Sequence, residues 1–180
     1  MKTASPTRRA LIAAAALAAL GAHAQAPLEN RWAELVPPGW DPMAGLEAPP
    51  AEIGLLGDGD PRVLAMMDRL RASWDQAPTR AELDRRRFRL SGYVVPLEQV
   101  RGEVTEFLLV PYFGACIHSP PPPANQIVHV TPPKGVKGLR TMDVVTVQGL
   151  LRVARNDSPM GASGYRIEGA AVEPYVEPPR

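Results

Sequence analysis

Hydrophobic and polar residues alternate through much of the second half of the chain, which is the pattern of half-buried β-strands. The clearest example is the segment 142–154, where one phase of the alternation is uniformly apolar and the other is mostly polar. The apolar phase consists of Val145, Val147, Leu151 and Val153. Since only that phase is apolar throughout, we expect these four side chains to point into one core.

Four further segments show strand patterns. The strands are expected from Phe88 to the Pro96-Leu97-Glu98 turn, at 104–113, at 125–131 and around 165–172. The second of these is nearly continuous in apolar residues, so we expect it to be buried on both faces along part of its length. Five short strands separated by turns predict a mainly β fold, a small OB-like five-stranded barrel over residues 88–172. A small β-sandwich is the alternative.

The segment that precedes the strands, 61–87, has the 3.6-residue period of a helix. Asp60-Pro61 is typical of an N-cap followed by proline at the first helical position. Thr79 and Glu82 have the spacing of a capping box for a second, shorter helix. The apolar stripe of the first helix is formed by Val63, Met66, Met67, Leu70 and Trp74. We expect this segment to form a helical N-terminal layer packed across one end of the barrel.

The two flanks of this domain have the composition of connecting chain. Residues 25–60 are rich in proline and glycine and show no sustained period, so we expect an arm rather than a second domain. Trp32 and Trp40 are expected to fasten this arm to the domain surface. At the other end, residues 173–180 are proline-rich, and we expect a flexible C-terminal tail.

Residues 1–24 have the organisation of a cleavable signal peptide. Lys2 and the pair Arg8-Arg9 precede an apolar run, 10–20, and small residues follow at 22 and 24, which places the expected cleavage after Ala24. The arginine pair also allows the twin-arginine export route. We therefore expect a periplasmic protein. The apolar run is too short to cross a bilayer and no later one is longer, so no integral membrane segment is expected.

The charge balance argues against a nucleic acid as partner. Removing residues 1–24 takes away three of the 20 basic residues and none of the 19 acidic residues, which leaves a formal charge of −2. No stripe of Lys and Arg of the kind that neutralises phosphates is present. The Arg85-Arg86-Arg87 run is interpreted as a solvated helix end.

Residues 111–130 concentrate the side chains that carry chemistry. They contain the only cysteine, Cys116, and the two histidines outside the leader, His118 and His129, around a stiff run of four prolines. A thiolate and two imidazoles suit Zn²⁺ or copper, so we expect a metal site at Cys116, His118 and His129, with Zn²⁺ as the first choice. The fourth ligand stays open among Glu98, Glu103, Glu106 and Asp143.

Other interpretations of the same stretch remain. Cys116 can be a buried small residue, because free cysteine is among the most buried residue types. Cys116 beside an imidazole would also suit a cysteine-dependent enzyme, although no third group that would orient the imidazole is marked. The proline run, 120–123, suits docking of a partner, which points to a metal-free protein–protein interaction module.

Several segments resemble a family of exported bacterial proteins of unknown function. The resemblance runs over 32–37, 90–98, 106–118 and 120–128, and its centre is Gly-Ala-Cys-Ile-His-x-Pro-Pro-Pro-Pro-x-Asn-Gln at 114–126. It implies a location in the cell envelope and an association with ABC-type transporters and metal starvation. It implies no reaction. The resulting expectation is a non-enzymatic periplasmic accessory protein in metal handling, with zinc first, beside an envelope transporter.

Overall fold

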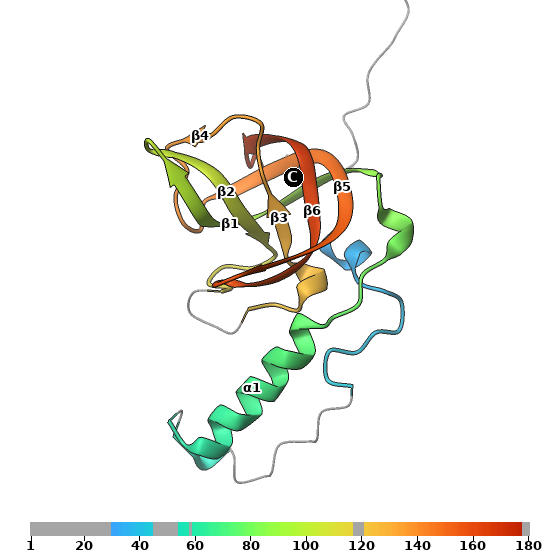
Figure 1. Cartoon of the computed structure of the whole chain (residues 1–180), viewed down its shortest axis with the longest axis vertical. Helices are drawn as coiled ribbons and strands as arrows, with labels where there is room; N and C mark the ends of the chain where they lie inside the picture. Colours follow the sequence, from blue (N-terminus) through green and yellow to red (C-terminus); the bar gives the residue numbers. More distant parts are fainter. Residues whose placement is uncertain (1–29, 45–53, 58, 117–120, 178–180) are drawn as a thin grey trace, which may run out of the picture.

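The structure is a computed structural model that describes residues 30–44, 54–57, 59–116 and 121–177. The expected signal peptide, 1–24, lies outside the described residues, as do 178–180 of the expected tail. The described residues form a β-barrel and an α-helix that projects from one end of it (Figure 1). Within the described part of the chain, no helix is long and apolar enough to cross a membrane.

The barrel is built from five strands. They are β1 (Arg87–Val100), β2 (Glu103–Val110), β3 (Val128–Val130), β5 (Val144–Ser158) and β6 (Gly161–Pro174), and a two-residue strand β4 (Val136–Lys137) pairs with the start of β2. The order is β1-β5-β6-β3-β2, and an antiparallel β1–β2 pairing closes it. Only β3 and β6 run parallel. The expected mainly β, five-stranded barrel is confirmed.

The inside of the barrel is filled by one phase of each strand. Val145, Val147 and Leu151 are buried in the main cluster, and Val153 packs against it, as the alternation predicts. Phe107 and Leu109 from β2 join them with no exposed surface. This cluster supplies the apolar burial that stabilises the domain.

Some strand boundaries differ from those expected. β1 does not end at Pro96 but passes through it, and the pairing with β2 shifts register there, which accommodates a residue without an N–H. The third strand is shorter than 125–131, because Ala124–Gln126 forms the 3-10 turn η5. β6 continues to Pro174, two residues past the expected end of the domain.

The helix α1 (Pro61–Asp75) begins as the sequence indicates, with the Asp60 carboxylate accepting a hydrogen bond from the Arg62 N–H. It stands at one end of the barrel, as expected, but it projects from that end instead of lying across it (Figure 1). None of its residues is fully buried, because its apolar stripe is only partly covered. The second helix is the 3-10 turn η4 (Ala81–Leu83), whose N-cap is Arg80 and not Thr79.

The N-terminal arm is fastened by its tryptophans. Trp32, in the 3-10 turn η2 (Trp32–Leu35), donates from Nε1 to the Ser91 carbonyl over 2.8 Å. Its ring lies against Gly92, where an added Cβ would approach the ring to 2.9 Å and the Val110 carbonyl oxygen to 2.7 Å. Glycine is therefore required at the strand bend. Trp40 packs on a small alanine cluster that includes Ala162 of β6.

Candidate functional site

The outer face of β1 and β2 carries a second apolar cluster, separate from the core. Val95, Leu108, Val110, Ala115 and Ile127 are buried there. This is why β2 is apolar on both faces, as its sequence predicts: Phe107 and Leu109 face inward while Leu108 and Val110 face this second cluster. The loop after β2 and the turn between β5 and β6 cover it, through Ala115 and Met160.

His129 lies on the same outer face, because its β3 neighbours Val128 and Val130 belong to the core. It pairs in register with Leu108 of β2 and is only 7% exposed. Its Nε2 lies 2.7 Å from Oε1 of Glu106, and its Nδ1 is buried without a hydrogen-bond partner. The site therefore contains a carboxylate–imidazole pair with one ring nitrogen unused.

Cys116 ends the turn that follows β2. It has a φ of 67°, in the left-handed region that few residues other than glycine adopt. Its side chain is half-buried and packs on the second cluster together with Met142 and Met160. Burial raises the pKa of the Cys116 thiol from 9.0 to about 11. At neutral pH the thiol is therefore protonated unless a cation displaces the proton.

The expected metal ligands are only partly placed. Cys116 and His129 both lie against the outer face of the β1–β2–β3 sheet, while His118 lies outside the described residues. Among the residues that are described, no three His, Cys, Asp or Glu side chains form a group that would hold a metal ion. Of the four acids considered as a fourth ligand, Glu106 is the one bound to His129.

The proline run is packed into the protein over its described part. Pro121 and Pro122 are buried and Pro123 is half-buried, while Pro120 lies outside the described residues. Pro121 faces Gly161 at the start of β6, where an added Cβ would approach the proline ring to 2.9 Å. A partner therefore cannot dock on Pro121 or Pro122, and that part of the interaction-module interpretation is wrong.

A groove of about 540 Å³ lies beside the His129–Glu106 pair. We call it the hairpin groove: residues 96–98 of β1 and Glu106 of β2 line one side, and residues 156–160, at the turn between β5 and β6, line the other. In OB folds, the face of strands 2 and 3 and the loop between strands 4 and 5 form the usual ligand site. β5 and β6 are the fourth and fifth barrel strands here, so the turn that lines the groove corresponds to that loop, and Glu106 comes from the second strand.

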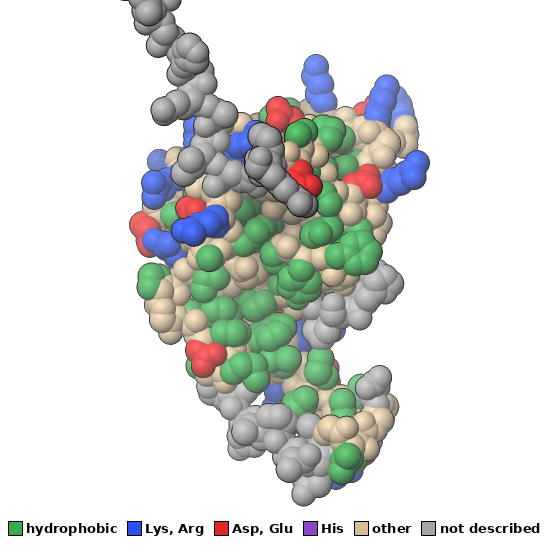
Figure 2. Space-filling model, turned by 180° about the vertical axis from the view of Figure 1, so that it is seen from behind, with side chains coloured by type: hydrophobic (Ala, Val, Ile, Leu, Met, Phe, Trp, Pro, Cys, Tyr) green, Lys and Arg blue, Asp and Glu red, His purple; other side chains and the backbone are tan. Residues whose placement is uncertain are grey.

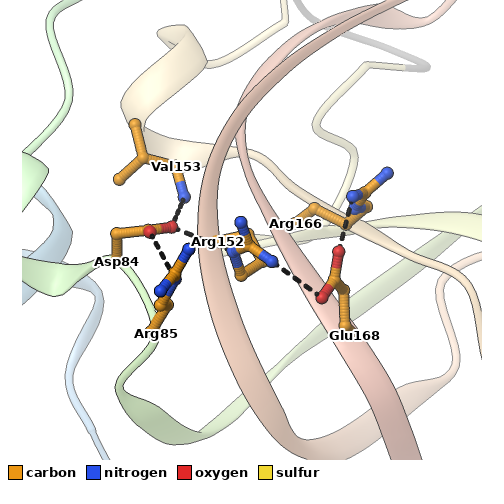
Figure 3. A network of polar contacts seen from close by, with 6 residues as sticks. All are labelled: Asp84, Arg85, Arg152, Val153, Arg166 and Glu168. Carbon is orange, nitrogen blue, oxygen red and sulfur yellow. Dashed lines mark hydrogen bonds and ion pairs between the residues drawn. The ribbon is translucent and has the colours of Figure 1, made fainter.

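A second polar cluster lies on the outside of β5 and β6 (Figure 3). Asp84 accepts hydrogen bonds from the Val153 N–H at 3.0 Å and from Arg152 Nε at 3.1 Å. Glu168 binds Arg152 at 3.1 Å and Arg166 at 2.6 Å. The Val153 N–H and then Arg152 hold the pKa of Asp84 below its ordinary value. This cluster ties η4 to the barrel wall.

Sequence reasoning missed both the hairpin groove and this second cluster. Their residues come from strands that are far apart in sequence, such as Glu98 and Asp157. The strand alignment of an OB topology could have indicated part of this arrangement. In that topology β3 lies between β2 and β6, so the outward side chains of these three strands share one face. His129, Glu106 and Arg166 are such side chains.

Comparison with known proteins gives a family and a fold neighbour. A family model described as a protein of unknown function, DUF3299, matches residues 32–174. The chain is also similar to the crystal structure of a DUF3299 family protein from Pseudomonas aeruginosa PAO1, with 39% sequence identity and a TM-score of 0.66. The match covers 86% of this chain and 100% of that one. Comparison with curated proteins gave no match. The chain belongs to the DUF3299 family, a family of unknown function.

Proposed function

We propose that this protein is a periplasmic accessory protein in metal handling, with zinc as the first candidate, beside an envelope transporter. The observation that supports the proposal is the His129–Glu106 pair, with its 2.7 Å contact and its unused Nδ1. Histidines that bind metals usually donate their other ring N–H to a carboxylate or carbonyl, which fixes the tautomer. A proton on Nε2 toward Glu106 leaves the Nδ1 lone pair free to bind a cation.

The remaining ligands in this proposal are Cys116 and His118. The packing of Cys116 on the outer-face cluster beside two methionine side chains supports a soft metal, because thiolates and thioethers favour zinc and copper. The protonated thiol would release its proton on binding, so metal affinity should fall as the solution is acidified. The barrel has its own core, so the metal-free protein should stay folded.

The test is titration calorimetry of Zn²⁺ into untagged protein. We expect stoichiometric binding that is lost in Cys116→Ser and in His129→Ala, and weakened roughly 10–100-fold in Glu106→Gln, which removes the carboxylate that orients the imidazole. Glu103→Gln is the matched control, because Glu103 lies on the same strand but pairs with Lys137. Equally weak binding in the wild type and all variants would contradict the proposal.

A metal-free interaction module is the second candidate, and exposed aromatic side chains favour it. Phe113 is 65% exposed and Tyr112 is 44% exposed, and Phe113 packs edge-on against Tyr93 of β1. Figure 2 shows hydrophobic side chains gathered over the middle of one side of the molecule, with most charged side chains nearer one end. Large apolar patches of this kind mark interaction surfaces. In this case partner binding would survive Cys116→Ser.

A cysteine-dependent enzyme finds less support. The raised pKa of Cys116 is opposite to the lowered pKa that activates a nucleophilic thiol. His129 is bound to Glu106, and no described histidine makes a hydrogen bond to Cys116.

A further inference from the structure

We propose that the hairpin groove binds a short extended peptide segment in which lysine or arginine alternates with apolar residues. This inference does not rest on the metal proposal: the groove shares Glu106 with it but includes neither Cys116 nor His129, and its test is made without metal. Its volume of about 540 Å³ lies within the range of about 300–1,000 Å³ that is usual for ligand sites.

The charge of the groove points to a cationic occupant. Three carboxylates line it, those of Glu98, Glu106 and Asp157, and no Lys or Arg is among the described residues of the lining. Asp157 is paired with Arg155 at 2.7 Å, so its charge is already balanced. Glu98 accepts only a neutral hydroxyl, that of Thr105, at 3.2 Å. Glu98 is therefore left for a cationic partner, together with Oε2 of Glu106, whose Oε1 is in contact with His129.

The Glu106 side chain is oriented by its contact with His129 of the neighbouring strand. The His129 imidazole, 7% exposed, is aimed at it, and their contact uses only Oε1 of the carboxylate. Oε2 has no partner among the described residues and belongs to a side chain that lines the groove. A buried polar side chain that orients a groove carboxylate is a built feature, unlike a set of freely moving surface acids.

The opposite wall is also preformed. The Ser158 hydroxyl donates to the Gly161 carbonyl at 2.8 Å and accepts from the Met160 N–H at 3.2 Å, which fixes the turn. Met160 packs on the second cluster from this position. A rigid wall reduces the ordering cost of binding.

Apolar side chains distinguish a peptide from a simple polyamine. Pro96, Leu97, Pro159 and Met160 line the groove between the acids. A polyamine would satisfy the carboxylates but leave this apolar surface without specific contacts. Alternating basic and apolar side chains, with the backbone extended, match both features.

The experiment uses the purified full-length protein in excess EDTA, so that no metal contributes. The probe is a fluorescein-labelled lysine–leucine–lysine–leucine peptide, followed by anisotropy, with a glutamate–leucine–glutamate–leucine peptide as the control. We expect saturable binding of the basic peptide only, weakening with added salt. Glu98→Gln should weaken it about 2–5-fold, the size expected for one exposed ion pair. Glu103→Gln, outside the groove, should leave it unchanged.

Met160→Ser tests the apolar contribution and should weaken the basic peptide but not spermidine. The proposal is overturned by any of three results: no saturable binding of the basic peptide, equal affinity in Glu98→Gln and wild type, or spermidine competing as well as the peptide does. Peptide binding in EDTA together with a failed zinc titration would remove the metal proposal alone. The reverse result would remove the groove proposal alone.

Discussion

The two faces of β2 carry similar apolar residues but differ in what surrounds them. On the inner face, Phe107 and Leu109 belong to the main apolar cluster, which also takes in Leu35 of η2 and Leu83 of η4. On the outer face, Leu108 and Val110 share the surface with a buried imidazole and a carboxylate. The inner face is covered mainly by the other strands, whereas the loop after β2 and the turn between β5 and β6 cover the outer one. The difference teaches that the inner face determines the fold, while the outer face combines apolar packing with the polar pair on which the proposed function rests.

Val147→Asp places a charge in the inner cluster and should cause the largest loss of stability. Val147 has no exposed surface, so the variant buries a charge without a partner and should cost at least about 4 kcal/mol, enough to unfold a domain of ordinary stability. Near-UV circular dichroism and thermal melting measure this. Gln148→Asp, on the opposite phase of β5, is the control and should melt close to the wild type. A folded Val147→Asp protein would contradict the assigned strand register.

Leu108→Ala sharpens the comparison by removing outer-face packing alone. We expect the free energy of unfolding to fall by about 2–3 kcal/mol, at the lower end of the range for leucine truncations, because the smaller outer cluster can collapse around the cavity. Leu109→Ala, the adjacent residue that faces the core, should cost more. Urea unfolding of the two variants measures the difference. Equal losses would show that the outer cluster is as tightly packed as the barrel core.

Asp84→Asn should cause the smallest loss of stability, since it alters the polar cluster on the outside of β5 and β6 and leaves both apolar clusters intact. The asparagine oxygen can still accept from the Val153 N–H, but the charge opposite Arg152 is lost. The pKa of Asp84 is held below its ordinary value of 3.8 in the folded protein, so its stabilisation is present above that pH and is lost as the pH falls through the folded pKa. The melting temperature of the variant should therefore lie slightly below the wild type at pH 7.

The difference between the two proteins should shrink when the same melts are repeated at pH values below 3.8. A gap that stays constant across this range would show that the carboxylate charge at position 84 does not contribute.

Strand alternation was enough to predict the barrel and its core. The phase that contains Val145 and Val147 is the buried one, and the two-sided burial of β2 also followed from its unbroken apolar run. The end of β1 was not predictable in the same way. Proline at position 96 normally ends a strand, and only the register shift against β2 accommodates it.

The candidate site was predictable in part. The outward direction of His129 follows from the inward direction of its two valine neighbours, whereas its pairing with Glu106 depends on how β3 aligns with β2. The hairpin groove depends on the turn at 156–160 folding next to β1, which no local pattern specifies. Local alternation therefore gives a residue's face, and only the topology gives its neighbours.

The Tyr165 hydroxyl donates to the Leu35 carbonyl at 2.7 Å and accepts from the Arg80 N–H at 2.7 Å, joining parts of the chain 130 and 85 residues apart in sequence. β6, which carries Tyr165, is also the strand that bridges β5 and β3. The barrel therefore cannot close until nearly the whole chain is available, because the β1–β5 and β3–β6 pairings join segments far apart in sequence. Proteins with such non-local contacts fold slowly, so this chain should remain unfolded while it is being synthesised.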